Sequence, residues 1–480
     1  MKDTVRTVDA RGIGVASPAD TVVEQSLYEI RAKIHPRAVQ GWFAAWRWTL
    51  VWATQLVYYG IAWLEWNGRQ AVLFDLAHRK FYIFGLVFWP QDFIYLTVLL
   101  VISALSLFLF TAVAGRLWCG YACPQTVYTE IFMWVEKNIE GDRNQRMKLD
   151  ASPLTGRKFG LKSAKHAAWV AIALWTGFTF VGYFTPIREL SIEVATSSTG
   201  PWESFWIAFY GFATYGNAGW MREQVCKHMC PYARFQSAMF DKDTMIITYD
   251  PERGEPRGSR SKRADPAALG LGACVDCGIC VQVCPTGIDI RKGLQYECIG
   301  CAACIDGCNQ VMDRMGYARG LIRYSITHAV EERLTRCEMF ARALRPRVLA
   351  YFSILGAIVI AASVSLWLRV PLKVDVIRDR AALSREVEGG LIENVYRLQV
   401  MNTVEKDRRF LVHVEGLPTA AVAAGASVDL AGASTQMVAV KVRIQAGQVA
   451  PGTHKIRFVV AAEDDAHVVV SEKSVFIVRR

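Results

Sequence analysis

The sequence predicts an α-helical membrane protein of about five spans, with a cysteine-rich domain inserted before the last span and an all-β sandwich at the C-terminus. Three observations lead to this prediction. Apolar residues make up 52% of the 480 residues and gather in long stretches. Cysteines crowd into the segment 274–308. After Pro371 the hydrophobic period changes to two, which is typical of strands.

Five stretches hold the roughly 20 apolar residues that cross a bilayer. They run approximately over Phe43–Leu64, Phe93–Ala114, Ala164–Phe184, Trp202–Trp220 and Val348–Leu368. Tryptophan lies near their ends, as expected at headgroup level. Arg47 lies one turn inside the first stretch, from where its side chain can snorkel to the interface. The apolar segment Phe81–Pro90 is too short to span, and we expect it to be interfacial or re-entrant.

Lysine and arginine predict the orientation of these spans. They crowd the tail before the first span and the loops after the second and fourth, and they are few in the two opposite loops. Basic loops stay cytoplasmic, so we expect a multi-pass membrane protein with its N-terminus and cysteine-rich domain on the cytoplasmic side and its sandwich on the opposite side. The net charge of +11 is then mostly a topology signal, and we expect membrane lipid rather than nucleic acid as a partner.

Two further observations fit this topology. The first 40 residues are polar and no cleavage site follows the first apolar run, so no cleavable signal peptide is expected. All 13 cysteines precede the fifth span. Disulfides form in oxidising compartments, so cysteines confined to the reducing side fit metal ligands and thiols.

The predicted domain plan has six parts. They are a tail (1–41), four spans (42–220), a cytoplasmic segment with a basic linker (221–264), the cysteine-rich domain (265–335), the fifth span (336–370) and the sandwich (371–480). The linker Pro251–Arg263 is rich in Gly, Pro and Arg and lacks apolar periodicity, so we expect a solvated tether near anionic lipid.

The cysteine-rich domain repeats the pattern C-x2-C-x2-C-x3-C, which holds iron–sulfur cubes in bacterial-type ferredoxins. The first three thiolates of a run bind one cube and the fourth reaches the other. We therefore assign one [4Fe–4S] cluster to Cys274, Cys277, Cys280 and Cys308, and the second to Cys298, Cys301, Cys304 and Cys284. The alternative is a pair of structural zinc sites, which more often show C-x2-C pairs far apart.

A second cysteine repeat, C-x3-C-P, follows the second and fourth spans. It comprises Cys119 and Cys123 before Pro124, and Cys226 and Cys230 before Pro231. On a helix, residues i and i+4 share a face, and proline suits the first turn of the next helix. If the two motifs face each other, four thiols converge at the cytoplasmic membrane face.

Such a site could hold copper, zinc or another iron–sulfur cluster. It could also cycle between dithiol and disulfide. The alternative is that the four thiols only pack at the membrane edge and have no chemical role. Met221, Met229 and His228 would suit copper, although ordinary packing is the more common role for a methionine. We expect His166 to be interfacial and Cys337 to be a bystander.

The C-terminal region alternates over six runs: Leu372–Ile377, Val395–Val400, Phe410–Val414, Val438–Ile444, Ile456–Val460 and Val468–Val475. Turn residues about every ten positions favour an antiparallel, immunoglobulin-like sandwich of about seven strands. A protein-docking platform and a stabilising cap are both compatible with this pattern.

Most of the chain resembles the cytochrome c oxidase accessory proteins of the CcoG/FixG/RdxA type. The resemblance rests on Ile34–Arg37, both C-x3-C-P motifs, Cys284–Gln295, Gly320–Tyr324 and the terminal sandwich. It implies an inner-membrane polyferredoxin that helps to assemble cbb3-type oxidase by reducing Cu(II) to Cu(I), with assembly factors or copper transporters as partners. Asn309 departs from the proline that follows the last ligand in generic bacterial ferredoxins.

Three functional hypotheses follow. The leading one is an oxidoreductase, a cupric reductase, in which the clusters take electrons from an unidentified donor and Cys119, Cys123, Cys226 and Cys230 hold the copper. The second is an electron-transfer subunit that oxidises quinol and is similar to those of nitrate and nitrous oxide reductase systems. The third is a non-enzymatic assembly scaffold. The sequence leaves open a homo-oligomer, the cluster potentials and the partner of the sandwich.

Overall fold

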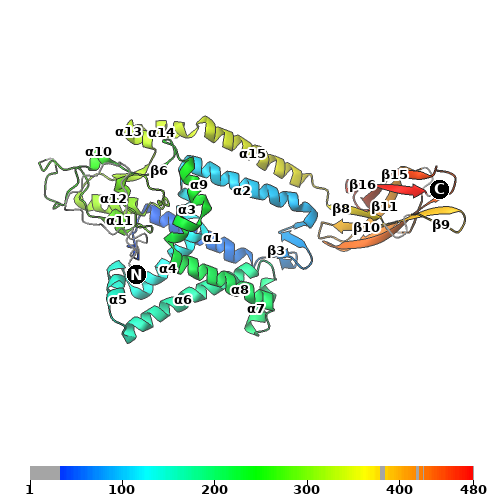
Figure 1. Ribbon diagram of the computed structural model, residues 1–480, viewed down its shortest axis with the longest axis horizontal. Helices are drawn as coiled ribbons and strands as arrows, with labels where there is room; N and C mark the ends of the chain where they lie inside the picture. Colours follow the sequence, from blue (N-terminus) through cyan, green and yellow to red (C-terminus); the bar gives the residue numbers. More distant parts are fainter. Residues whose placement is uncertain (1–32, 267, 379–383, 418–420, 425, 479–480) are drawn as a thin grey trace, which may run out of the picture.

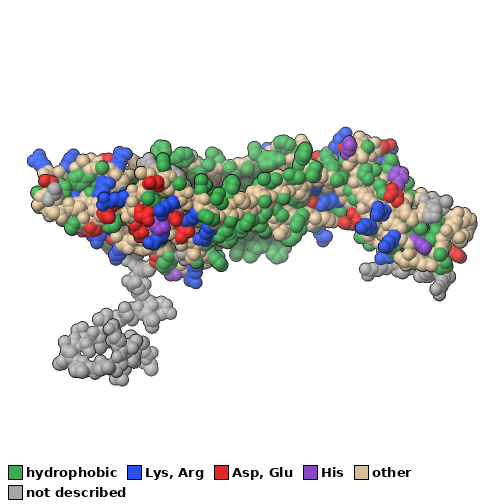
Figure 2. Space-filling model, turned by 90° about the horizontal axis from the view of Figure 1, so that it is seen from above, with side chains coloured by type: hydrophobic (Ala, Val, Ile, Leu, Met, Phe, Trp, Pro, Cys, Tyr) green, Lys and Arg blue, Asp and Glu red, His purple; other side chains and the backbone are tan. Residues whose placement is uncertain are grey.

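The computed structural model describes residues 33–266, 268–378, 384–417, 421–424 and 426–478. The molecule is elongated, with the cysteine-rich domain at one end, long helices in the middle and the β-sandwich at the other end (Figure 1). Figure 2 shows hydrophobic side chains gathered over the middle, while charged side chains cluster at both ends. An apolar belt between two charged ends is the surface expected of a protein that is embedded in a bilayer.

The middle is built from five helices in two groups. Helices α2 (Phe93–Ala114) and α15 (Pro346–Trp367) pack together, as do α6 (Gly156–Val181) and α8 (Pro201–Thr214), and α1 (Trp42–Ile61) lies near the latter pair (Figure 1). Gly177 lets α6 and α8 approach closely, since a Cβ there would lie 2.4 Å from the carbonyl oxygen of Ile207. Small residues at contacts of this kind are typical of helices packed in membranes.

The prediction of about five spans is not confirmed. In the part of the chain that the structure describes, two helices are long and apolar enough to cross a membrane, namely Pro90–Ala114 and α15. The other predicted spans form helices but are less uniformly apolar. Arg47 lies within α1, α6 begins with several lysines, and α8 is regular for only 14 residues before it continues as a π-helix, Tyr215–Met221.

Shorter helices cover the end of the helical middle that faces the cysteine-rich domain: α3 (Leu117–Tyr121), α4 (Pro124–Glu140), α5 (Arg143–Ala151), the π-helix Val225–Met229 and α9 (Pro231–Met239). Helix α4 is amphipathic. Its buried residues Phe132 and Val135 pack with Trp169 of α6, and the rings of Phe132 and Trp169 stack at 5.1 Å. At the opposite end of the middle lies α7 (Ile187–Ala195).

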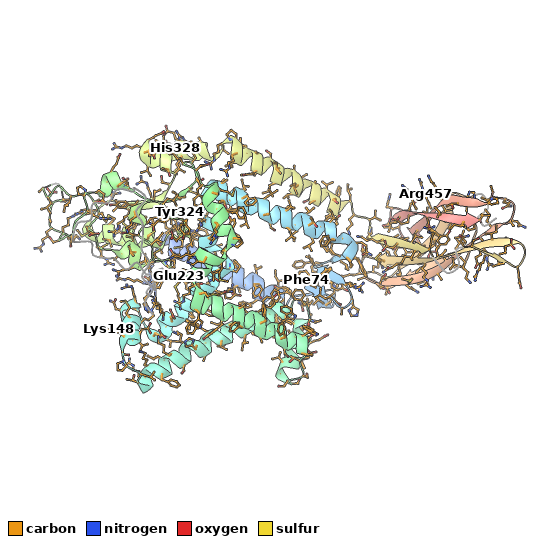
Figure 3. All side chains as sticks on the ribbon, viewed as in Figure 1. Phe74, Lys148, Glu223, Tyr324, His328 and Arg457 are labelled. Carbon is orange, nitrogen blue, oxygen red and sulfur yellow. The ribbon has the colours of Figure 1, made fainter. Side chains whose placement is uncertain are left out.

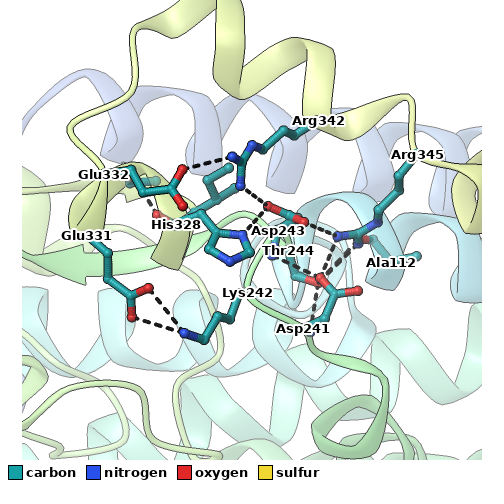
Figure 4. A network of polar contacts seen from close by, with 12 residues as sticks. Ala112, Asp241, Lys242, Asp243, Thr244, His328, Glu331, Glu332, Arg342 and Arg345 are labelled. Atoms are coloured by element: carbon teal, nitrogen blue, oxygen red, sulfur yellow. Dashed lines mark hydrogen bonds and ion pairs between the residues drawn. The ribbon is translucent and has the colours of Figure 1, made fainter.

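A polar network fixes the start of α15 beside the end of α2 (Figure 4). Arg345 bonds both Asp241 and the carbonyl oxygen of Ala112, while Asp243 accepts from His328 at 2.7 Å and pairs with Arg342 at 3.5 Å. Burial opposes ionisation of Asp243, but these partners hold its pKa below the ordinary value. The network therefore ties the loop after α9 to the last span.

The cysteine-rich domain is framed by a two-stranded sheet, β6 (Ile246–Tyr249) with β7 (Ile322–Ser325). Between the strands lie α10 (Pro251–Gly254), α11 (Ile279–Gln282), a 3-10 turn (Ile290–Lys292) and α12 (Ala303–Met315), and α13 (Thr327–Glu331) and α14 (Arg336–Ala343) follow. The predicted solvated tether Pro251–Arg263 instead packs on this domain. Its backbone bonds residues 272–274, and Arg260 donates to the carbonyl oxygen of Gly272 at 2.6 Å.

The sandwich consists of two antiparallel sheets. One has the order β12-β14-β10-β8, with β9 also pairing β10, and the other has the order β13-β11-β15-β16. The nine described strands exceed the predicted seven, and the short strands β9, β12 and β13 lie outside the six predicted runs. Those six runs lie in strands, except that β16 begins one residue later than predicted, at Val469. The bounds are β8 Leu372–Arg378, β9 Arg385–Val387, β10 Leu391–Asn402, β11 Arg408–Glu415, β12 Ala421–Ala424, β13 Ser427–Leu430, β14 Thr435–Gln445, β15 Gly452–Ala462 and β16 Val469–Val478.

Small hairpins between α1 and α2 face the sandwich. They are β1 (Glu65–Trp66), β2 (Arg69–Gln70), β3 (Val72–Asp75), β4 (Lys80–Ile83) and β5 (Leu86–Phe88). The segment Phe81–Pro90, expected to be interfacial or re-entrant, is mostly the hairpin of β4 and β5. Val87 and Trp89 of this segment bury against Met401 of the sandwich.

Candidate iron–sulfur sites and the membrane-face thiols

The first predicted ligand set comes together in the structure. Cys274, Cys277, Cys280 and Cys308 line one small cavity, which is closed by apolar side chains such as Ile322. Three of these cysteines come from the loop before α11 and from α11 itself, and Cys308 comes from α12. Burial and the neighbouring thiols raise the pKa of Cys308 to about 12. Cys277 is exposed, so this distal set lies at the domain surface.

The second set forms a proximal site that faces the helical middle. Cys284, Cys298, Cys301 and Cys304 line a second cavity. Cys280 lines both cavities, so the two sites are adjacent. Cys301 and Cys304 flank Ala302, whose left-handed backbone (φ 58°) starts α12. Burial raises the pKa of Cys298 to about 12 and that of Cys301 to about 11.

The residues present fit iron–sulfur cubes. Each set offers four thiols around an otherwise apolar cavity, and a cube binds four cysteine thiolates. Among the described residues, no three Cys, His, Asp or Glu side chains lie close enough together to hold a single metal ion.

The two C-x3-C-P motifs share one backbone hydrogen bond. The N–H of Cys123 donates to the carbonyl oxygen of Trp118 at 3.0 Å, and the N–H of Cys230 donates to that of Val225 at 2.8 Å. The i, i+4 prediction assumed one α-helix through both cysteines of a motif. In the first motif α3 ends at Tyr121, before Cys123, and in the second motif Val225–Met229 is a π-helix. Local π-helices occur frequently at functional sites. Each second cysteine precedes a proline that begins the next helix, as predicted.

The four thiols of these motifs lie near enough to influence one another's ionisation. Burial and the neighbouring thiols of Cys123, Cys119 and Cys230 raise the pKa of Cys226 to about 12. The pKa of Cys119 is raised to about 11 by burial and by Cys123. The thiols do not surround a single point, however, since no three of them meet the spacing of a single-ion site. To close all four sulfurs on one ion, the motifs would have to move.

A buried carboxylate clamps the motifs together. Glu136 of α4, which follows the first motif, accepts from Arg222, which precedes the second, at 2.6 Å. It also accepts from Arg146 at 3.0 Å and lies 3.7 Å from Lys165. The three cations hold the pKa of Glu136 below its ordinary value despite burial. Gln125 adds a second link by donating to the carbonyl oxygen of Arg222 at 3.1 Å.

Both motifs lie directly against the proximal site. A Cβ on Gly120, between the two cysteines of the first motif, would stand 2.8 Å from Cα of Cys301. In the second motif, Lys227 donates to the carbonyl oxygen of Thr286 at 2.9 Å, and Thr286 contacts the sulfur of Cys284 at 3.2 Å. The membrane-face thiols are therefore next to the proximal ligands and farther from the distal ones.

Helix α1 is held by the same domain. Asp306 of α12 accepts from the N–H of Ala44 at 2.7 Å and so caps a helix whose own N-cap residue is a glycine. Arg47 does not snorkel to the interface as predicted. It is 7% exposed and donates to the carbonyl oxygen of Cys301 at 2.6 Å. Figure 3 shows Tyr324 in the same region, where it donates to the carbonyl oxygen of Gly300.

The remaining candidates are spread out. His166 bonds the hydroxyl of Tyr215 at 2.9 Å and stacks on Trp220, and its interfacial position stays a prediction. Met229 is exposed, as are His228 and Cys337. Sequence reasoning missed Gly120, Lys227, Asp306 and Glu136. A glycine inside a cysteine motif was the one available signal, because close backbone approach is a common reason for glycine.

Comparison with known proteins agrees with this architecture. Residues 221–327 match a family model described as a 4Fe-4S dicluster domain, residues 96–141 match a 4Fe-4S binding domain, and residues 362–479 match the IG-like fold at the C-terminal of FixG. The chain is 38% identical to nitrogen fixation protein FixG of Rhizobium meliloti over 450 residues, covering 87% of this chain and 85% of that protein. It is 38% identical to protein RdxA of Cereibacter sphaeroides, covering 87% and 90%.

Proposed function

Since the chain belongs to the FixG/RdxA family of membrane iron–sulfur proteins, we propose that it assists assembly of cbb3-type cytochrome c oxidase by reducing Cu(II) to Cu(I) at the cytoplasmic face. The observation that carries this proposal is that both C-x3-C-P motifs contact the loops of the proximal cysteines, through Gly120 and Lys227. An electron on the proximal cluster would therefore lie next to the membrane-face thiols.

When bound, the two [4Fe–4S] clusters supply one-electron carriers. The eight cysteines of the distal and proximal sets hold them. Copper is the substrate: Cu(II) gains one electron and leaves as Cu(I). Soft thiolate ligands select Cu(I), so Cys119, Cys123, Cys226 and Cys230 favour the reduced product. The match of residues 96–141, which include Cys119 and Cys123, to a 4Fe-4S binding domain supports a third cluster as the competing assignment for the membrane-face thiols.

The proposed topology has five spans, with α1, α6 and α8 crossing beside α2 and α15. The apolar belt supports this arrangement. The N-terminus and cluster domain are cytoplasmic and the sandwich is periplasmic, where it docks oxidase assembly factors or copper transporters. Reporter fusions in the loop 142–155 and after residue 478 test the orientation. A periplasmic signal from the loop would invert it.

The function is tested by replacing Cys119, Cys123, Cys226 and Cys230 together with alanine, with Cys337→Ala as the control. The protein is purified without oxygen, reduced with dithionite and freed of excess reductant. Cu(II) is then added with a Cu(I)-specific chelator. We expect the quadruple variant to keep its iron and lose Cu(I) formation, while the control matches the unaltered protein. Unchanged Cu(I) formation in the quadruple variant would reject the thiol assignment.

Cluster-ligand variants separate the enzyme from the scaffold hypothesis. A reductase requires Cys301, whereas a scaffold tolerates Cys301→Ser under some redox condition as long as the protein folds. Oxidase assembly in cells that carry this variant is the readout. Full assembly without reductase activity would favour the scaffold.

A further inference from the structure

A cavity of about 430 Å³ lies where the cluster domain meets α1 and α4, and neither set of ligand cysteines fills it. Its wall includes Cys301 of the proximal site and Cys226 of the second membrane-face motif. Figure 3 shows Glu223, another wall residue, in the middle of the molecule between the cluster domain and the helices. Its size is that of a small-molecule site, typically about 300–1,000 Å³.

The chemistry of the wall is that of a site for a flat, mostly apolar ligand with polar ends. Ala45, Trp48 and Trp134 provide apolar surface, and Glu130 and Glu223 provide two carboxylates. The buried cations in the wall already have anionic partners: Arg146 and Arg222 bond Glu136, and Arg47 lies 3.9 Å from Glu130. Neutralised cations give little binding energy for a free anion.

Two buried polar groups in the wall, the Nε atoms of Arg47 and Arg146, lack a hydrogen-bond partner. The Nε of Arg47 is buried and has no hydrogen-bond partner, although Nη1 of the same side chain bonds the carbonyl oxygen of Cys301. A buried, unsatisfied donor costs about 1–3 kcal/mol, so a ligand that brings an oxygen acceptor would be stabilised there. The same guanidinium also contacts the proximal cysteine loop.

The cavity wall includes exposed residues of α1 and α4. Trp134 is 51% exposed and lies edge-on to Trp48, with 6.3 Å between the rings, and Ala45 is exposed on α1. Exposed tryptophan is typical of the headgroup level. A ligand that enters here comes from the membrane, and its apolar tail can stay there.

We infer that this cavity binds the head of a membrane hydroquinone, the reductant of the iron–sulfur sites. Oxidation to the quinone releases two electrons and two protons. The two cysteine sets beside the cavity hold two one-electron acceptors, and Glu130 and Glu223 are the carboxylates that lie in position to take the protons. This inference rests on the proposed electron-transfer function and names the source of its electrons, which the copper step leaves open.

Binding is tested on the full, cluster-loaded protein with decylubiquinone, followed by quenching of tryptophan fluorescence. Ala45→Phe narrows the cavity, and Ala53→Phe makes the same change on an exposed face of α1 outside it. We expect Ala45→Phe to weaken binding at least about tenfold and Ala53→Phe to leave it unchanged. Equal affinity in both variants, or loss of binding on adding phosphatidylglycerol, would overturn the inference.

Electron entry is tested separately with decylubiquinol in the absence of oxygen, by bleaching of the cluster absorbance. Glu130→Gln keeps the shape of the wall, so we expect normal decylubiquinone binding and slower bleaching. Bleaching at the unaltered rate would remove Glu130 from the proposed role. Dithionite-driven Cu(I) formation in Ala45→Phe should match the unaltered protein. If the unaltered protein binds decylubiquinone but neither it nor the variants form Cu(I) with dithionite, the copper proposal is rejected and the cavity assignment stands.

Discussion

The two domains at the ends of the helical middle dock in different ways. The cluster domain meets the helices through one close approach of two backbones, Gly120 against Cys301, and through side chains that bond backbone groups, Lys227 with Thr286 and Asp306 with the start of α1. The sandwich meets the hairpins through a small cluster around Trp89 and through ion pairs such as Arg69 with Glu405. At the first interface close packing leaves the domain little room to move, whereas the second interface is held by side-chain contacts.

This difference indicates that the interface of the cluster domain is the one that matters for electron transfer. Side-chain ion pairs tolerate adjustment by rotamer changes, while contacts between backbones do not. An electron acceptor must stay at a fixed short distance from its donor, and rigid backbone contact provides that. A domain that only docks partners needs no such precision. Substitutions at the cluster end should therefore cost activity, and substitutions at the sandwich end should cost little.

Gly120→Ala should have the largest effect, near-complete loss of copper reduction. The added Cβ would stand 2.8 Å from backbone atoms of Cys301, so the motif and the proximal loop must separate. We expect iron content to fall little while reoxidation of the reduced protein by Cu(II) slows severely. Gly160→Ala is the matched control, since a Cβ there meets no atom within 4 Å. Equal rates in the two variants would show that the close approach is unimportant.

Glu136→Ala should cost about 3–5 kcal/mol of stability, because it leaves the buried cations Arg146 and Arg222 without their carboxylate partner, while Lys165 keeps Glu140. Thermal unfolding of the purified protein, followed by intrinsic fluorescence, measures the loss. Glu331→Ala, which breaks an exposed pair with Lys242, should cost no more than about 1 kcal/mol. A similar melting temperature for both variants would contradict the role of Glu136 as a clamp.

Asp306→Ala should have an intermediate effect, about 1–2 kcal/mol, because α1 loses the cap that another domain supplies. Asp306→Asn keeps an oxygen acceptor and should recover part of the stability. Protease sensitivity near residues 38–44 gives a local readout. If the alanine variant is as resistant as the unaltered protein, the cap does not hold the domain.

Glu405→Ala should have the smallest effect. It removes the half-buried pair with Arg69 at the sandwich end, which is worth about 0–1 kcal/mol. Copper reduction and decylubiquinol oxidation should both remain at the level of the unaltered protein. A clear loss of either activity would mean that the sandwich controls electron transfer, and the contrast between the two interfaces would then fail.

Much of the site could be predicted because its information is local. The spacing of the eight cysteines anticipated which four line each cavity, since ligands on one tight loop have little freedom. The strands of the sandwich were predicted by alternation, since one face of each sheet is buried. The helices of the middle were predicted correctly, but the number of them that span the membrane was not confirmed. Arg47 and the lysines of α6 make α1 and α6 less uniformly apolar than α2 and α15.

The sequence by itself determined the cofactor class, the repeat of the C-x3-C-P motif and the order of domains, because each depends on residues that are neighbours along the chain. Only the tertiary structure decided which cysteine set is proximal, that Arg47 turns toward Cys301, and that a cavity opens beside both. Cys119 and Cys301 are 182 positions apart. Packing of several helices against one domain sets such contacts, and no local pattern records them.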